Sequence, residues 1–273
     1  MNFKLKMIAA AAAMVVAGGA NATMDNFMSG NSSLAFIALD SVGTPISLMA
    51  DLDFNVNSFN PTAGTTIVWN FNTNSLTVNG VASASTQTNW SGAYSSFASL
   101  AQSADTKWAV IAGDSLSSNV SGDQRYLTTA APGTTLATLR GQTKINLQGW
   151  AAVDLLVNAN NALQTDSNAS TATSGQAYVG TNTSNGQFKW NNKFVGNAFA
   201  SEGATASFYQ LDTNNGTATN RALVTPFAGT FSYASGVLTY AVAAVPEPET
   251  YAMLLAGLGM LGFMARRRLG SRA

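Results

Sequence analysis

The feature that most constrains this fold is a repeated alternation of apolar and polar residues over short segments. The segment Leu48–Val56 shows the alternation most clearly. Its side chains divide between two faces, with Leu52, Phe54 and Val56 on one and Asp51, Asp53, Asn55 and Asn57 on the other. A period of two residues is that of a β-strand with one face on a core, so this segment is predicted as a half-buried strand.

Similar short segments recur along the chain and are separated by Gly, Asn and Ser. The further predicted strands are Leu34–Leu39, Thr65–Asn72, Ser75–Val78, Lys107–Ala112, Gln124–Thr129, Gln187–Trp190, Ala204–Leu211, Gly229–Tyr233 and Val237–Val242. Two short connections, Thr73-Asn74 and Ala234-Ser235-Gly236, predict hairpins. The second connection has a glycine, which can adopt the positive φ that a tight turn requires.

Apolar residues spaced three and four apart predict two helices. One includes Phe97, Leu100, Ala101 and Ala104, and the other spans Leu147–Leu163. The segment Asn158–Asn185 is dominated by Asn, Ser, Thr, Ala and Gly and is predicted as a long loop or an exposed, poorly ordered segment. The expected fold is therefore mainly β, a β-sandwich with one or two helices. A β-helix is disfavoured because no repeat of fixed period occurs.

The chain of 273 residues contains neither cysteine nor histidine. Their absence excludes disulfides, thiolate zinc sites, and every Ser-His-Asp or Cys-His catalytic arrangement. No motif in the chain predicts a metal site or a cofactor. The main domain is therefore predicted to be non-enzymatic.

Charge is distributed unevenly, although the formal net charge is zero. Residues 1–22 carry two lysines, residues 23–244 carry seven Lys/Arg and eleven Asp/Glu, and residues 245–273 carry four Arg and two Glu. The zero is a cancellation between two basic ends and a middle region of net charge −4. Because this acidic middle lacks a basic patch, nucleic-acid binding is not expected.

The first 22 residues have the organisation of a secretory signal peptide. Its parts follow in order: Lys4 and Lys6, the apolar run Met7–Ala17, the break Gly18-Gly19, and an A-x-A cleavage site with Ala20 and Ala22. The alternative is an alanine-rich helix of the mature fold. Cleavage predicts a mature chain that begins at Thr23 and an exported domain over residues 23–244.

Residues 245–273 combine prolines, an apolar run and basic residues. Pro246, Glu247 and Pro248 come first, Tyr251–Ala265 is apolar and uncharged, and the chain continues with Arg266, Arg267 and Arg268. The run 251–265 is predicted as a transmembrane helix, and the arginines are expected to stay cytoplasmic. Its fifteen residues span about 22 Å as a helix, less than the ~30 Å hydrocarbon core, so bilayer thinning or snorkelling has to cover the difference.

This order of parts resembles the PEP-CTERM sorting signal of Gram-negative bacteria. The resemblance implies recognition by an integral-membrane exosortase, cleavage, and transfer to the cell surface or the extracellular matrix. It also implies that Pro246, Glu247 and Pro248 form the recognition motif. The alternative is an ordinary C-terminal membrane anchor.

The middle of the chain resembles, more loosely, a group of PEP-CTERM proteins of unassigned function. The residues that carry this similarity are Asn89-Trp90, Lys107–Asp114 and Gln124–Leu127. It implies a shared exported domain and no known activity.

Acidic residues of the middle region suggest two alternative chemistries. The series Asp51-x-Asp53-x-Asn55 begins like an EF-hand calcium loop, but Val56 and Thr62 replace the required glycine and glutamate. A glycosidase needs two facing carboxylates. The candidates are Glu202, Asp114, Asp123 and Asp154. Solvated surface carboxylates are the simpler interpretation of all four.

Aromatic residues suggest a carbohydrate-binding alternative. Five tryptophans could stack on sugar rings, or they could be buried in the core: Trp69, Trp90, Trp108, Trp150 and Trp190.

The leading hypothesis is an exported protein of the cell surface or of an exopolysaccharide (biofilm) matrix. It would be anchored transiently in the inner membrane and processed by an exosortase. The alternatives are a carbohydrate-binding or calcium-assisted adhesion module, with exopolysaccharide as candidate partner, and a carboxylate-based hydrolase.

Overall fold

Strands predicted from the alternating pattern make up most of the observed structure. The computed structural model describes residues 23–26, 29–83, 89–114, 125–141, 150–164, 168–184, 187–190, 193–195, 198–213, 221–244 and 255–261. The prediction of a mainly β fold is confirmed. The helices are α2 (Ser91–Leu100), α3 (Leu136–Arg140), α5 (Trp150–Asn161) and the short 3₁₀ helix η2 (Val179–Asn182).

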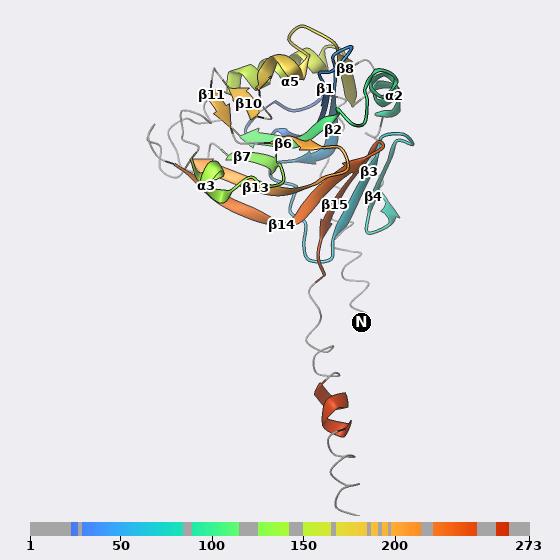
Figure 1. Cartoon of the computed structure of the whole chain (residues 1–273), viewed down its shortest axis with the longest axis vertical. Coiled ribbons are helices and arrows are strands. Elements are labelled where there is room, and N and C mark those ends of the chain that lie inside the picture. The colour runs from blue at the N-terminus through green and yellow to red at the C-terminus, as the bar shows by residue number, and fades with distance from the viewer. Residues whose placement is uncertain are drawn as a thin grey trace, which may run out of the picture.

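Twelve strands form one antiparallel sheet, shown in Figure 1. They are β1 (Ser33–Asp40), β2 (Ile46–Asn55), β3 (Thr66–Asn70), β4 (Ser75–Val78), β5 (Val81–Ala82), β6 (Lys107–Asp114), β7 (Arg125–Ala130), β8 (Ala169–Ala172), β12 (Ala200–Ser201), β13 (Thr205–Thr213), β14 (Ala222–Ala234) and β15 (Val237–Val242). The sheet order is β5-β4-β3-β15-β14-β13-β7-β6-β1-β2-β8, with β12 paired to β6. A separate small sheet contains β9 (Thr183–Ser184), β10 (Gln187–Trp190) and β11 (Lys193–Val195).

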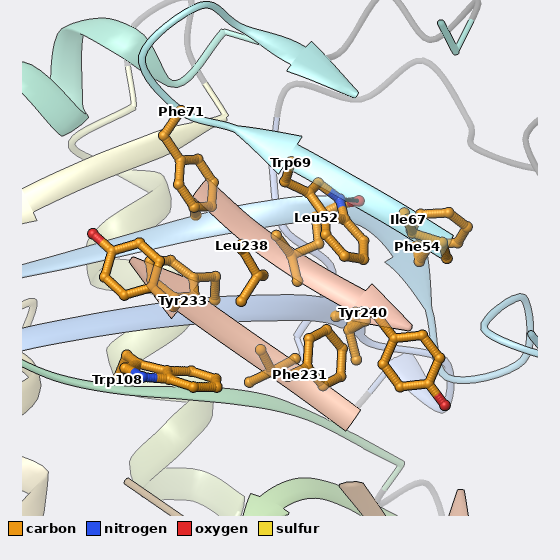
Figure 2. Packing of buried hydrophobic residues seen from close by; sticks show 14 of the residues in the cluster. Leu52, Phe54, Ile67, Trp69, Phe71, Trp108, Phe231, Tyr233, Leu238 and Tyr240 are labelled. Carbon is orange, nitrogen blue, oxygen red and sulfur yellow. Dashed lines mark hydrogen bonds between the residues drawn. The ribbon is translucent and has the colours of Figure 1, made fainter. Parts of the chain in front are cut away.

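The main sheet curls into a half-barrel, so that its two arms face each other. The ring of Phe36 on β1 lies 4.9 Å from that of Phe71 after β3 and 4.8 Å from that of Tyr233 on β14. β1 is not a sheet neighbour of either strand, so these contacts cross the interior. Figure 2 shows Phe71 and Tyr233 among the other apolar side chains of this interior. The predicted β-sandwich of two separate sheets is therefore not observed. One continuous sheet curls over and supplies both layers.

A second apolar cluster lies on the outer face of β1, β2, β6 and β7. In β1, Phe36 and Ala38 face the interior, whereas Ala35 and Ile37 join the outer cluster. The outer cluster includes Val153 and other residues of α5, which covers this part of the sheet in Figure 1. β1 is consequently buried on both faces, which explains its uninterrupted apolar sequence.

Both predicted hairpin turns are confirmed. Asn74 between β3 and β4 has φ = 52°, and the two-residue turn between β14 and β15 has φ = 49° at Ser235 and 78° at Gly236. The Asn74 side chain also caps α2, because its Oδ1 accepts the backbone N–H groups of Trp90 (2.7 Å) and Ser91 (2.6 Å). The β3–β4 turn thereby holds α2, which in turn packs on β2 and β8 of the opposite arm.

A bulge between β13 and β14 places a glycine against an aromatic ring. The register shifts between Ser207 and Tyr209. Within the shifted stretch of β14, the N–H of Gly229 donates to the Tyr240 hydroxyl at 3.0 Å. A Cβ at Gly229 would lie 2.5 Å from the Tyr240 ring, so only glycine fits without a shift.

The prediction of one long loop over Asn158–Asn185 is wrong. This segment contains the end of α5, β8, η2 and β9. β8 pairs with β2 at the edge of the sheet, and Ala169 and Ser170 are buried there. Small side chains fit this covered edge, but they produce no apolar periodicity from which a strand could be predicted.

Candidate functional site

The last strand of the domain leads directly into the C-terminal segment. Val242 is buried, and its N–H donates to the Thr65 carbonyl at 2.8 Å. The Ala243 carbonyl accepts the Gly64 N–H at 3.3 Å. Ala244 is the last described residue of the domain, and the predicted motif Pro246, Glu247 and Pro248 lies outside the described residues.

Part of the predicted transmembrane helix is described. Residues 255–261 are helical, and four large apolar side chains expose between 56 % and 68 % of their surface: Leu255, Leu258, Met260 and Leu261. None of the helices in the described part of the chain has the length and hydropathy needed to cross a membrane. Arg266, Arg267 and Arg268, and the rest of the predicted span 251–265, lie outside that part.

The amino end of the described chain is docked on the domain. Ala20 and Ala22, the predicted cleavage residues, lie outside the described residues, but Met24 is buried in the outer apolar cluster. The Met24 N–H donates to Asn161 Oδ1 at 3.0 Å, and Asn161 Nδ2 donates to the Met24 carbonyl at 2.8 Å. A chain cut before Thr23 would retain this contact with α5.

Asp51 is turned into the protein and away from any calcium loop. It accepts hydrogen bonds from Ser33 Oγ and from the Asp53 N–H, both at 2.8 Å. Burial raises the pKa of Asp51 to about 7, the two hydrogen bonds oppose this shift, and the Asp53 and Asp25 carboxylates add to it. Among the described residues, no group of three His, Cys, Asp or Glu could hold a metal ion.

Three of the five tryptophans are core residues and do not form sugar platforms. Trp69, Trp90 and Trp108 are fully buried. Each indole N–H has a backbone carbonyl partner, on Leu52 (2.8 Å), Asp51 (2.8 Å) and Ser201 (2.9 Å) respectively. The side chains of Trp150 and Trp190 lie outside the described part of the structure. The aromatic interpretation is therefore wrong for the three that the structure places.

The carboxylates considered for hydrolysis lie on separate elements. Asp114 ends β6 and forms an ion pair with Arg125 at 3.0 Å. Asp154 is buried on α5. Glu202 follows β12 and accepts the Ser235 N–H at 2.7 Å. Asp123 lies outside the described residues.

A surface pocket of about 450 Å³ lies between α2 and β8. Its lining consists of small, amide and hydroxyl side chains and one leucine: Asn89, Gly92, Ala93, Ser96, Leu163, Ala169, Ser170 and Thr171. No acid or base lines this pocket, so its chemistry is that of hydrogen bonding without proton transfer.

The outer face of the arm β4-β3-β15-β14-β13 carries aligned hydroxyl groups, and we call it the hydroxyl face. Strand registers place two rows across it, Thr77–Val68–Thr239–Ser232–Thr205 and Thr66–Ala241–Thr230–Ser207. These side chains are exposed or half-exposed and alternate with buried core residues. Neighbouring strands are about 4.8 Å apart, so the hydroxyls form two rows, which are interrupted at Val68 and Ala241.

The hydroxyl face could not be predicted from the sequence. The pattern Thr-x-Ser at residues 205–207 and 230–232 shows that polar residues face outward. However, the rows depend on strand order, which is set by long-range pairing.

Comparison with known proteins identifies one part of the chain. Residues 244–268 match the PEP-CTERM protein-sorting motif. No curated protein and no solved structure matches the chain significantly. The motif is processed by an exosortase, a membrane enzyme, and the proteins that carry it are exported. The C-terminal segment, which follows the last strand without a spacer, is thus a sorting signal, and the chain is a PEP-CTERM motif-containing protein.

Proposed function

We propose that this protein is a non-enzymatic component of the cell surface or extracellular matrix, released from the inner membrane by exosortase cleavage. The observation that carries the proposal is the sorting motif at residues 244–268, directly after a folded domain. The docked Met24 supports export with signal-peptide cleavage, because the second residue after the predicted cleavage site is already paired with Asn161 of the domain.

A non-enzymatic role is supported by the interactions of the acidic groups. Asp51 is held by Ser33, Asp114 by Arg125, and Glu202 by the backbone N–H of Ser235. The pocket between α2 and β8 contains no titratable side chain. These carboxylates therefore have structural partners, and the pocket lacks the acid and base that hydrolysis requires.

The test is the mass of the mature protein isolated from its native host. Processing predicts a chain that begins at Thr23 and ends upstream of Arg266. Joint substitution of Pro246 and Pro248 by Ala should leave a full-length, membrane-bound chain, whereas the neighbouring substitution Glu249→Gln should be processed normally. A wild-type chain that extends to Ala273 in the membrane would refute the proposal.

A second candidate is favoured by the hydroxyl face, namely binding of a neutral polysaccharide. Residues 54–104 and 222–246 contain no charged residue, so four strands of this face present hydroxyl and amide groups without charge. Such a surface can exchange hydrogen bonds with sugar hydroxyls, a polar mode of binding that does not use the buried Trp69, Trp90 and Trp108.

Binding of the folded protein to purified host exopolysaccharide would test this candidate, with and without calcium. Thr239→Lys places a charge in the centre of the face and should weaken binding. Thr44→Lys, in the exposed β1–β2 turn, is the control. Equal binding by both variants, or none by the wild type, would count against the candidate.

A further inference from the structure

The junction between domain and sorting signal has no spacer. The hydrogen bonds of Val242 with Thr65 and of Ala243 with Gly64 keep the chain in the fold up to one residue before the motif. The apolar run begins at Tyr251. Only seven Cα–Cα steps therefore separate Ala244, the last described domain residue, from the predicted membrane span.

Seven steps set an upper limit on the distance between the domain and the bilayer. Fully extended, they reach about 25 Å. The headgroup layer takes about 5–8 Å of that length. Because the fifteen-residue run is shorter than the hydrocarbon core is thick, its first residue lies deeper in the bilayer and uses up more of the tether. A domain of this size is about 45 Å across, which is roughly twice the tether length, so the surface around the exit point is held within about 20 Å of the headgroups.

That surface consists of residues 60–65 and 79–82, which we call the exit face. Gly64 contacts Ala243 directly, and Asn79 forms two hydrogen bonds with the neighbouring Thr66 (N–H to carbonyl, 2.7 Å, and Oδ1 from N–H, 2.7 Å). The exit face has no charged residue. Ala63, Ala82 and Val81 are exposed, the last by 55 %.

We propose that the exit face lies against the lipid headgroups while the precursor is tethered, an inference that rests on the membrane-anchored sorting proposed above. The domain carries a net charge of −4, and its acidic residues lie in other segments. An anionic membrane surface repels those segments. The uncharged exit face meets no such repulsion, and its hydroxyl, amide and backbone groups can hydrogen-bond to headgroups.

The absence of cysteine allows a direct test, because any introduced cysteine is unique. The full chain would carry an NBD fluorophore at Ala63→Cys or Val81→Cys on the exit face. The matched control is Ala234→Cys, at the last residue of β14, which pairs with Val237 at the far end of β15, about 17 Å from Val242 along the strand. Vesicles of phosphatidylethanolamine and phosphatidylglycerol would contain a lipid with a headgroup nitroxide.

Labels at positions 63 and 81 should be quenched several-fold more than the label at position 234. A long Gly-Ser insertion after Ala244 should remove that difference. Equal quenching at all three positions of vesicle-bound protein, or undiminished quenching with the long tether, would overturn the inference but leave the sorting proposal intact. A protein that does not float with vesicles would overturn the tether itself and the inference with it.

Discussion

Asp51→Asn tests the most unusual electrostatic feature of the domain. The carboxyl lies where three segments meet. Ser33 Oγ donates to the Asp51 carboxyl and accepts the Asp25 N–H. The Trp90 indole N–H donates to the backbone carbonyl of Asp51, and the Asp51 N–H donates to the Asn168 carbonyl. Asparagine keeps the shape of the side chain and the acceptor for the Asp53 N–H, but removes the charge.

The expected change in the free energy of unfolding follows from the pKa of Asp51, which burial raises from 3.8 to about 7. Because the folded-state pKa is raised, the folded protein binds more protons than the unfolded chain between these values. The contribution of Asp51 to the free energy of unfolding is therefore most favourable below pH 4. It falls by about 1.4 kcal/mol per pH unit until about pH 7, or by about 4 kcal/mol in all. Above pH 7 the contribution is constant.

Urea denaturation of the isolated segment 23–244 at pH 5, 6, 7 and 8 would measure this dependence. The wild type should lose stability across the series, whereas Asp51→Asn should lose less and exceed the wild type at pH 8. Asp105→Asn removes a half-exposed carboxylate from a turn and should retain the wild-type slope. Identical slopes for Asp51→Asn and the wild type would show that Asp51 does not titrate in this range.

Three further substitutions test packing and capping by the same denaturation assay. Gly229→Ala drives a methyl group into the Tyr240 ring and should destabilise the domain by about 2 kcal/mol, whereas Gly92→Ala meets open space on α2 and should be neutral or slightly stabilising. Asn74→Ala removes the cap of α2 and should cost about 1–2 kcal/mol. Asn161→Ala leaves the Met24 backbone unpaired and should cost about 1–3 kcal/mol, with the exposed Asn158→Ala as control.

Local signals in the sequence were sufficient for most of the long strands and for both hairpins, but not for β8. The two-residue period of Leu48–Val56 predicted β2, and the turn residues Asn74 and Gly236 predicted the two tight connections. These features depend on neighbours in the chain. The curl of the sheet depends on pairings such as β15 with β3 and β13 with β7, which join segments far apart in sequence.

The burial of polar residues was the least predictable property. The alternation correctly placed Asp51 opposite Leu52, but a polar face was expected to meet solvent. In the structure Asp51 is only 8 % exposed, within hydrogen-bonding reach of the segments that contain Ser33, Trp90 and Asn168. None of the three segments that cover Asp51 shows a periodic pattern that predicts this packing, so the burial of Asp51 could not be predicted from the sequence.

The contact between Met24 and Asn161 also constrains when the domain can be completed. It joins residues 137 positions apart, and closure of so long a loop is slow compared with formation of the hairpins. A chain that crosses a membrane from its amino end presents Met24 long before α5 has emerged. The first residues of the mature protein therefore cannot dock before α5 has been delivered, and this contact stays open until more than half of the chain has crossed the membrane.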